Sequence, residues 1–192
     1  QGVLHTLWID KRDQPAKGST QKYPGAAIYR NESVDGGLTF GPDTKLADHS
    51  CECCRIGLAR NPQGQLQATW RHVFDGNTRD HAFASVGAPA NRITRSTHDD
   101  WQINACPHHG PGLALHAVGA QMGYHTVWFG IRKMQGQDQA AVRYARLNAR
   151  GEPLPETLRV VPDPRAEHAD VLADGPRVAV VWRSSEGAVT TL

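Results

Sequence analysis

The stretch that decides the fold reads Ser33-Val34-Asp35-Gly36-Gly37-Leu38-Thr39-Phe40. Asp35, Gly36 and Gly37 tolerate the positive φ angles that a tight hairpin needs. The side chains of Asp35 and Thr39 can form hydrogen bonds inside the turn, and Phe40 is expected to pack beneath it. The stretch therefore predicts a hairpin after the strand-like segment 26–30. An ordinary polar hairpin is the plainer interpretation of the same residues.

Tryptophans outside this stretch reveal a repeat. They recur roughly every 60 residues, and each ends an apolar run that follows a turn-forming glycine. These tryptophans are Trp8, Trp70, Trp128 and Trp182. The spacing favours a repeated unit of short strands. No segment shows helical periodicity, and no apolar run is long enough for a membrane span.

Aligning the tryptophans gives a four-stranded unit, with the tryptophan at the end of its second strand. The units are expected at 1–47, 54–97, 111–161 and 168–192, with a strand at 38–46 and a loop at 131–139. This predicts an all-β fold of β-propeller type with four-stranded antiparallel blades. One first and one fourth strand are missing, so we expect about four blades, the last partial, of a larger propeller. The alternative is a four-bladed ring closed by both chain ends.

The charge balance limits the classes of partner. The chain has 21 basic and 19 acidic residues, a net charge of +2. This near balance gives no reason to expect nucleic acid or an anionic membrane as a partner. At 192 residues, the chain is one domain or part of one.

Four cysteines fall in two loops that precede the first strands of adjacent units. Cys51, Cys53 and Cys54 lie in one loop, and Cys106 lies in the other, close to His108. First strands begin near a propeller axis, so the four sulfurs are expected to converge. Disulfides that link Cys106 to the other loop are the first interpretation. Copper or zinc bound by the cysteines and His108 is the second, and inert thiols are the third.

Basic side chains lie where strands end on the face that carries the cysteine loops. The loops on this face are longer than the turn at 33–40 and are the more usual location of functional residues. Arg55, Arg71 and Arg79 can bind a carboxylate through paired hydrogen bonds. Asp80 is the candidate acid–base residue. His108 and His109 complete the expected ligand-binding set. The alternative is that these charges only brace the loops. Trp101 is expected to cap the core rather than to stack on a sugar.

The turn resembles the Asp-box, or BNR repeat, of sialidase-like β-propellers. The residues that carry this resemblance are Ser33, Asp35, Gly37, Thr39 and Phe40. Four further segments are similar to a bacterial group of exported BNR-repeat proteins. They are Cys51-Glu52-Cys53-Cys54, Trp70-Arg71, Arg79-Asp80 and the stretch 101–110. The resemblance implies a six-bladed propeller, a periplasmic or secreted location, and a carbohydrate or other small molecule as ligand.

The resemblance to active sialidases is incomplete. Those enzymes use an arginine triad, a tyrosine–glutamate pair, an aspartate and an Arg-Ile-Pro motif. The nearest match here is Arg55-Ile56-Gly57, and no tyrosine–glutamate pair can be placed on the loop face. The first hypothesis is therefore a propeller that binds an anionic carbohydrate or a metal. The alternatives are a glycoside hydrolase that acts on an anionic sugar, and a structural or interaction module.

Overall fold

The fold is all-β, as the sequence predicts. The computed structural model describes residues 2–20, 25–119, 121–186 and 189–191, and these contain fourteen strands and one short 3-10 helix, Asp75–Asn77. The first sheet contains β1 (Leu4–Asp10), β2 (Ala26–Ser33) and β3 (Thr44–Ser50). The second contains β4 (Ile56–Arg60), β5 (Leu66–Arg71), β6 (His81–Ser85) and β7 (Thr94–Arg95).

The other two sheets continue this pattern. The third contains β8 (Gly112–Val118), β9 (Gln121–Met134), β10 (Gln137–Asn148) and β11 (Pro153–Val160). The fourth contains β12 (Ala166–Asp174), β13 (Arg177–Glu186) and β14 (Val189–Thr191). Within each sheet, every described strand pairs antiparallel with the strands next to it in the chain, so each sheet is a meander.

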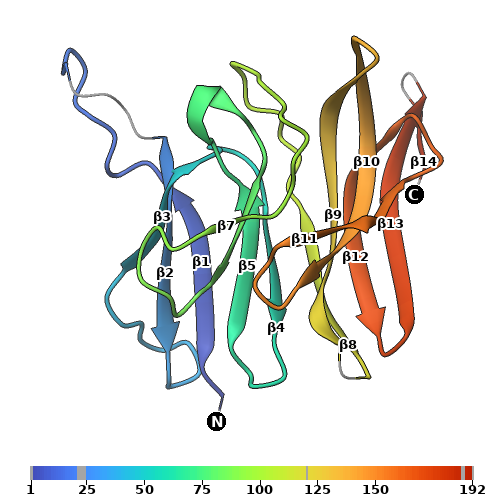
Figure 1. Ribbon diagram of the computed structural model, residues 1–192. Helices are drawn as coiled ribbons and strands as arrows, with labels where there is room; N and C mark the ends of the chain where they lie inside the picture. Colours follow the sequence, from blue (N-terminus) through green and yellow to red (C-terminus); the bar gives the residue numbers. More distant parts are fainter. Residues whose placement is uncertain (1, 21–24, 120, 187–188, 192) are drawn as a thin grey trace.

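The sheets stand side by side in chain order (Figure 1). Three apolar clusters join each sheet to the next. Ile28 and Trp70 lie in the first cluster, Phe83 and Leu147 in the second, and Val171 in the third. Burying this apolar surface between sheets stabilises the row, at about 25 cal/mol for each Å² removed from water. The first and fourth sheets lie at opposite ends of the row, and closure into a ring stays a prediction.

Close approach of the third and fourth sheets depends on a glycine at the start of β8. A Cβ atom added to Gly112 would lie 2.5 Å from Oδ1 of Asp170 and 3.0 Å from the backbone nitrogen of Val171. Any larger residue would therefore push β12 away from β8.

Backbone hydrogen bonds gather three connections at one end of the row, the upper end in Figure 1. Cys51 donates to the carbonyl of Arg71 at 2.9 Å, and Val73 donates to that of His49 at 2.7 Å. The connection after β7 joins them because Arg79 donates to the carbonyl of Trp101 at 2.7 Å. The loops before β4, after β5 and before β8 therefore form one continuous surface.

The turn at the opposite end forms the predicted internal hydrogen bonds. Asp35 accepts the Ser33 hydroxyl at 2.7 Å, the Thr39 hydroxyl at 2.6 Å and the Leu38 and Thr39 amides at 3.0 Å. These amides are no longer available for a strand ladder, so the strand predicted at 38–46 is wrong at its start and begins at Thr44. Phe40, which the sequence suggests can pack beneath the turn, is 43% exposed.

The loop predicted at 131–139 is replaced by strand. β9 and β10 extend toward each other and are joined by Gln135 and Gly136 alone. Both residues have positive φ, 52° and 81°, which is the geometry of a two-residue hairpin whose twist matches its strands. Across the residues that the structure describes, no helix is sufficiently long and apolar for a membrane crossing.

Candidate functional site

The four cysteines converge, as the sequence predicts. Cys53 and Cys106 form a disulfide that joins the connection before β4 to the connection before β8. Cys51 and Cys54 are buried free thiols. All four sulfurs lie within 4.8 Å of one another. We call these residues the cysteine cluster. The first interpretation of the sequence, a disulfide between the two loops, is confirmed, with Cys53 as the partner of Cys106.

Cys51 lies at the centre of the cluster. The Cys54 thiol donates to the Cys51 sulfur at 3.1 Å, and the Cys51 and Cys106 sulfurs are 3.2 Å apart. The hydrogen bond from Cys54, the Cys53 backbone and the nearby arginines lower the pKa of the Cys51 thiol to about 6, although burial acts to raise it. The pKa of Cys54 is raised because its proton is held against Cys51. Of these two thiols, Cys51 is therefore the one that ionises more readily.

Arg71 is buried directly behind the thiols. It is 1% exposed and donates to the carbonyls of Arg79 and Phe129 at 2.6 Å and of His109 at 3.2 Å. Burial lowers the pKa of Arg71, whereas negative charge on Cys54 and Cys51 would raise it. Among the described residues, no carboxylate forms an ion pair with Arg71. Its donors are occupied by carbonyls of three elements, so Arg71 binds these elements together.

An open cavity of about 530 Å³ borders the cluster. Its chemically distinctive lining residues are His49, Glu52, Asn77, Arg79, Asn104 and Cys106. Arg79 differs from Arg71 because its side chain forms no hydrogen bond or ion pair with any residue that the structure describes, and its Nε is buried without a partner. Glu52 is paired with Lys11. Of the arginines that the sequence singled out, Arg79 is the one that lines this cavity. We call it the cysteine-side cavity.

Asp80 lies beside Arg79 in sequence but outside this lining. It is 1% exposed, pairs with Arg95, and accepts the backbone N–H groups of Asp99 at 3.1 Å and Asp100 at 3.2 Å. Burial raises the pKa of Asp80. These contacts brace the connection before β8. Asp80 thus braces a loop, as the alternative interpretation of the sequence has it, with Arg95 as its partner.

The histidines beside Cys106 separate from the cysteine cluster. His108 has a left-handed backbone, with φ of 59°, and is exposed. It lies outside the group of four sulfurs, which corrects the expected metal-ligand set. His109 belongs instead to a group with Glu167 and His168. Burial and the neighbouring His168 lower the pKa of His109 to about 4. Glu167 also pairs with Arg183 at 2.5 Å, so a cation there would compete with a guanidinium.

Two other residues named from the sequence serve packing. Arg55 is exposed and donates to the carbonyl of Ala169 at 3.4 Å, away from the cysteine-side cavity. Trp101 is buried in the core, as expected, with its ring 5.2 Å from the Arg71 guanidinium carbon and 5.9 Å from the Phe129 ring. Trp101 therefore supports Arg71 from one side.

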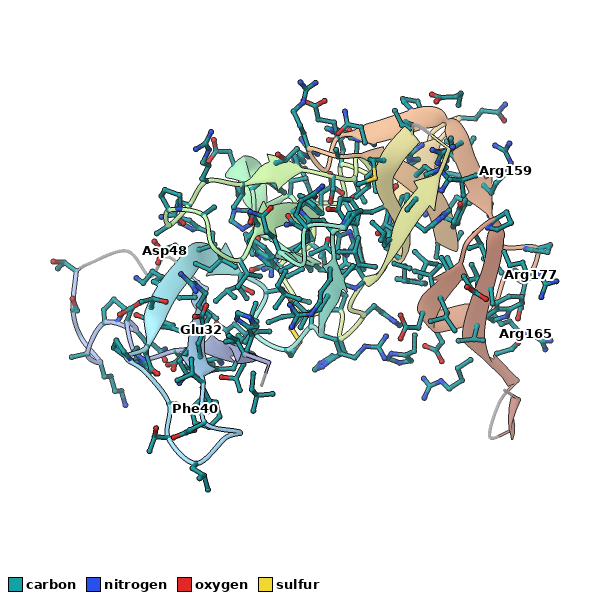
Figure 2. All side chains as sticks on the ribbon, turned by 90° about the horizontal axis from the view of Figure 1, so that it is seen from below. Glu32, Phe40, Asp48, Arg159, Arg165 and Arg177 are labelled. Atoms are coloured by element: carbon teal, nitrogen blue, oxygen red, sulfur yellow. A yellow bond between two sulfur atoms is a disulfide. The ribbon has the colours of Figure 1, made fainter. Side chains whose placement is uncertain are left out.

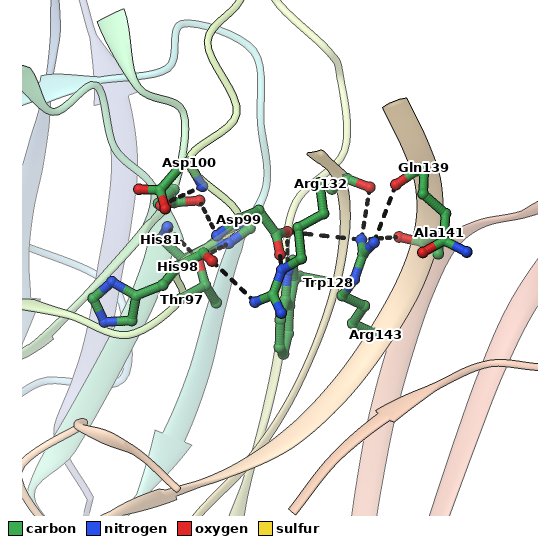
Figure 3. A network of polar contacts seen from close by, with 12 residues as sticks. His81, Thr97, His98, Asp99, Asp100, Trp128, Arg132, Gln139, Ala141 and Arg143 are labelled. Atoms are coloured by element: carbon green, nitrogen blue, oxygen red, sulfur yellow. Dashed lines mark hydrogen bonds and ion pairs between the residues drawn. The ribbon is translucent and has the colours of Figure 1, made fainter. Parts of the chain in front are cut away.

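Sequence reasoning missed a carboxylate that recurs beside the repeated tryptophans. The indole N–H of Trp8 donates to Asp10 at 2.9 Å, that of Trp128 donates to Asp99 at 2.7 Å, and that of Trp182 donates to Asp163 at 2.9 Å. Figure 3 shows Asp99 with Trp128, Arg132 and Arg143 around it. Arg132 donates to Asp99 at 3.0 Å, and a Cβ at Gly130 would lie only 1.9 Å from its carboxylate. These groups enclose most of the aspartate, which is 5% exposed.

Trp70 is the exception to this recurrence. Its ring is fully buried, and its Nε1 has no hydrogen-bond partner in the part of the chain that the structure describes. His72 lies 6.4 Å away, centroid to centroid, and its pKa is lowered to about 4 by burial. The unit without the carboxylate is thus the unit whose loops carry the cysteine cluster.

Sequence comparison adds no assignment to this geometry. No protein-family model matches the chain, and no curated protein matches it significantly. The site must therefore be interpreted from its own residues.

Proposed function

We propose that this chain is part of an exported, sialidase-like β-propeller that binds a small anionic ligand, a carboxylate-bearing sugar, in the cysteine-side cavity. The observation that carries the proposal is Arg79. Arg79 lines a cavity of about 530 Å³, and its side chain forms no hydrogen bond or ion pair with any described residue. A guanidinium binds a carboxylate through parallel hydrogen bonds, so a carboxylate on a ligand would supply the missing partner.

The architecture supports a propeller. Four meander sheets stand in a row in chain order, and each carries one of the repeated tryptophans, in β1, β5, β9 and β13. The turn at 33–40 has the internal hydrogen bonds expected of the Asp-box that it resembles. These features agree with the family resemblance and give it a structural basis. The disulfide is typical of proteins exported to an oxidising compartment.

The chemistry of the cavity supports binding rather than hydrolysis. No tyrosine is among the described residues that line it, and Asp80 is buried outside it. Asn77 and Asn104 add amide groups that can bind hydroxyls. A sugar with one carboxylate matches this combination of one cation and several neutral polar groups.

Calorimetric titration tests this proposal. N-acetylneuraminate is titrated into the protein, with its methyl ester and N-acetylglucosamine as uncharged controls. We expect binding of the acid alone, and at least a tenfold loss of affinity in Arg79→Gln, about 1.4 kcal/mol. The control variant is Arg177→Gln, at the end of the molecule opposite to Asp48 (Figure 2). Equal affinity for the acid and its ester, or unchanged binding in Arg79→Gln, would overturn the proposal.

A further inference from the structure

The cysteine cluster holds a nucleophile and a disulfide in contact. Cys51 lies 3.2 Å from one sulfur of the Cys53–Cys106 disulfide and 3.1 Å from the Cys54 thiol. Exchange between thiols and disulfides proceeds when a thiolate attacks a disulfide sulfur and displaces the other sulfur. Cys51 is therefore close enough to attack the disulfide at Cys106, and the Cys54 thiol is close enough to react with Cys51 afterwards.

We propose that the cysteine cluster is a thiol–disulfide exchange site in which Cys51 transfers the disulfide from Cys53–Cys106 to Cys51–Cys54. In the first step the Cys51 thiolate bonds to Cys106 Sγ. The Cys53–Cys106 bond breaks, and its electron pair leaves with Cys53, which takes up the proton that Cys54 releases. In the second step the Cys54 thiolate bonds to Cys51 Sγ, and Cys106 leaves as the thiolate. One disulfide, one thiol and one thiolate exist at every stage, so no oxidant or reductant is needed.

The surroundings favour the charge that these steps require. Arg71 is a buried guanidinium without a paired carboxylate among the described residues, and its nearest ionisable neighbours include Cys51 and Cys54. A buried cation that lacks a counterion is strongly destabilising. A thiolate on Cys51 or Cys54 supplies negative charge that acts on Arg71. Arg79 adds a second positive charge beside Cys51.

Exchange would change the wall of the cavity. Cys106 lines the cysteine-side cavity together with Arg79. In the described state Cys106 is oxidised, whereas after exchange it presents a free thiol. The cavity would then offer a nucleophile to a small electrophile or disulfide that carries an anionic group. This inference does not depend on the sugar ligand of the proposed function.

A time course of alkylation tests the exchange on the native chain. Protein purified without reductant is treated with iodoacetamide, quenched in acid and blocked with N-ethylmaleimide in denaturant. Glu-C endoproteinase then cuts after Glu52, which separates Cys51 from Cys53 and Cys54. We expect the iodoacetamide label to accumulate on Cys106 over time, together with a Cys51–Cys54 cross-link. Cys106 cannot be labelled while it remains bonded to Cys53.

Two variants separate the two steps. Cys51→Ser removes the attacking thiol, so labelling of Cys106 should become at least tenfold slower. Cys54→Ser removes only the resolving thiol, so a Cys51–Cys106 cross-link should accumulate instead. Circular dichroism checks that both variants keep the β fold, and the wild-type time course decides the question even if they do not.

Three outcomes would overturn the inference. The first is label confined to Cys51 and Cys54 at all times. The second is protein without any reactive thiol, in which Cys51–Cys54 and Cys53–Cys106 are permanent disulfides. The third is one equivalent of zinc or copper, measured by elemental analysis, that protects all four thiols.

Discussion

Trp128 and Trp70 lie in the second strands of two neighbouring sheets, β9 and β5, yet their surroundings differ completely. The Trp128 indole donates to Asp99, and Arg132 and Arg143 lie around the same carboxylate. The Trp70 indole finds no acceptor among the described residues, and the neighbouring loop carries thiols. At Trp128 the polar groups satisfy one another, whereas near Trp70 the indole lacks an acceptor among the described residues and the cysteine cluster holds two free thiols.

The cavity beside Asp99 and the cavity beside the cysteine cluster differ in the same way. About 660 Å³ of space lies beside Asp99, lined by Asp99, Asp100, Gln102, Arg132, Lys133 and other residues; we call it the aspartate-side cavity. Its Asp99 and Arg132 pair with each other, and Asp100 pairs with Arg95. The smaller cysteine-side cavity holds the unpartnered Arg79. The aspartate-side cavity is therefore the larger of the two, whereas the cysteine-side cavity contains an arginine that is not engaged in a hydrogen bond or ion pair with a described residue.

The largest change in stability is expected when the Cys53–Cys106 disulfide is removed from the cysteine cluster. Cys106→Ser should lower the free energy of unfolding by about 4 kcal/mol, because the bond closes a loop with a sequence separation of 53 residues. Urea unfolding without reductant measures the change. Wild-type protein reduced with dithiothreitol is the matched control and should lose the same stability. A reduced protein as stable as the oxidised one would contradict the expectation.

A substitution of Asp99 should lower the stability of the fold almost as strongly. Asp99→Asn should cost about 3 kcal/mol, because Arg132 and Arg143 would lose the charge that compensates them in a buried site. Asp100→Asn is the matched control: its side chain is 75% exposed, so urea unfolding should show a loss below about 1 kcal/mol. Equal losses in the two variants would mean that the Asp99 network contributes no more than a surface pair.

Acid should destabilise the protein partly through His72. Burial lowers the pKa of His72 in the fold to about 4, below its ordinary value of 6.5. The unfolded chain therefore binds the proton first, and this contribution to stability is present above pH 6.5 and lost as the pH falls toward 4. The stability lost between pH 6.5 and pH 4 should therefore be about 2 kcal/mol smaller in His72→Gln than in the wild type. Urea unfolding at pH 7 and pH 4 measures it, and an unchanged pH dependence would refute it.

The smallest effect compares the tryptophans directly. Replacement by Phe removes the indole N–H from both sites. Trp128→Phe should cost about 1 kcal/mol more than Trp70→Phe, because only Trp128 loses a hydrogen bond and leaves a buried acceptor behind. Thermal unfolding of the two variants gives the difference. A larger loss for Trp70→Phe would show that the Trp70 indole has a partner after all.

The sequence predicted the parts of the fold that depend on local pattern. Glycine and aspartate turns with alternating apolar segments were enough for the all-β class, the turn at Asp35 and the convergence of Cys106 with the loop of Cys51. The predicted loop at 131–139 failed because the conformation of Gln135 and Gly136 decides whether two strands join directly. A pattern of polar residues does not report that conformation.

The candidate site was less predictable because its partners are distant in sequence. Trp8 and Asp10 are two residues apart, but Trp128 and Asp99 are 29 apart, so the recurrent carboxylate was not visible as a motif. Arg71 and Arg79 looked alike in the sequence. Only the fold shows that backbone carbonyls of other elements occupy Arg71 and leave Arg79 at the cavity. Side-chain type alone could not separate these roles.

The most direct test is a titration of the isotope-labelled protein with N-acetylneuraminate, followed by amide chemical shifts. The account predicts shifts that cluster at Asn77, Arg79 and Asn104, around the cysteine-side cavity. Shifts that cluster instead at Asp100, Gln102 and Lys133, around the aspartate-side cavity, or the absence of any shift, would contradict it.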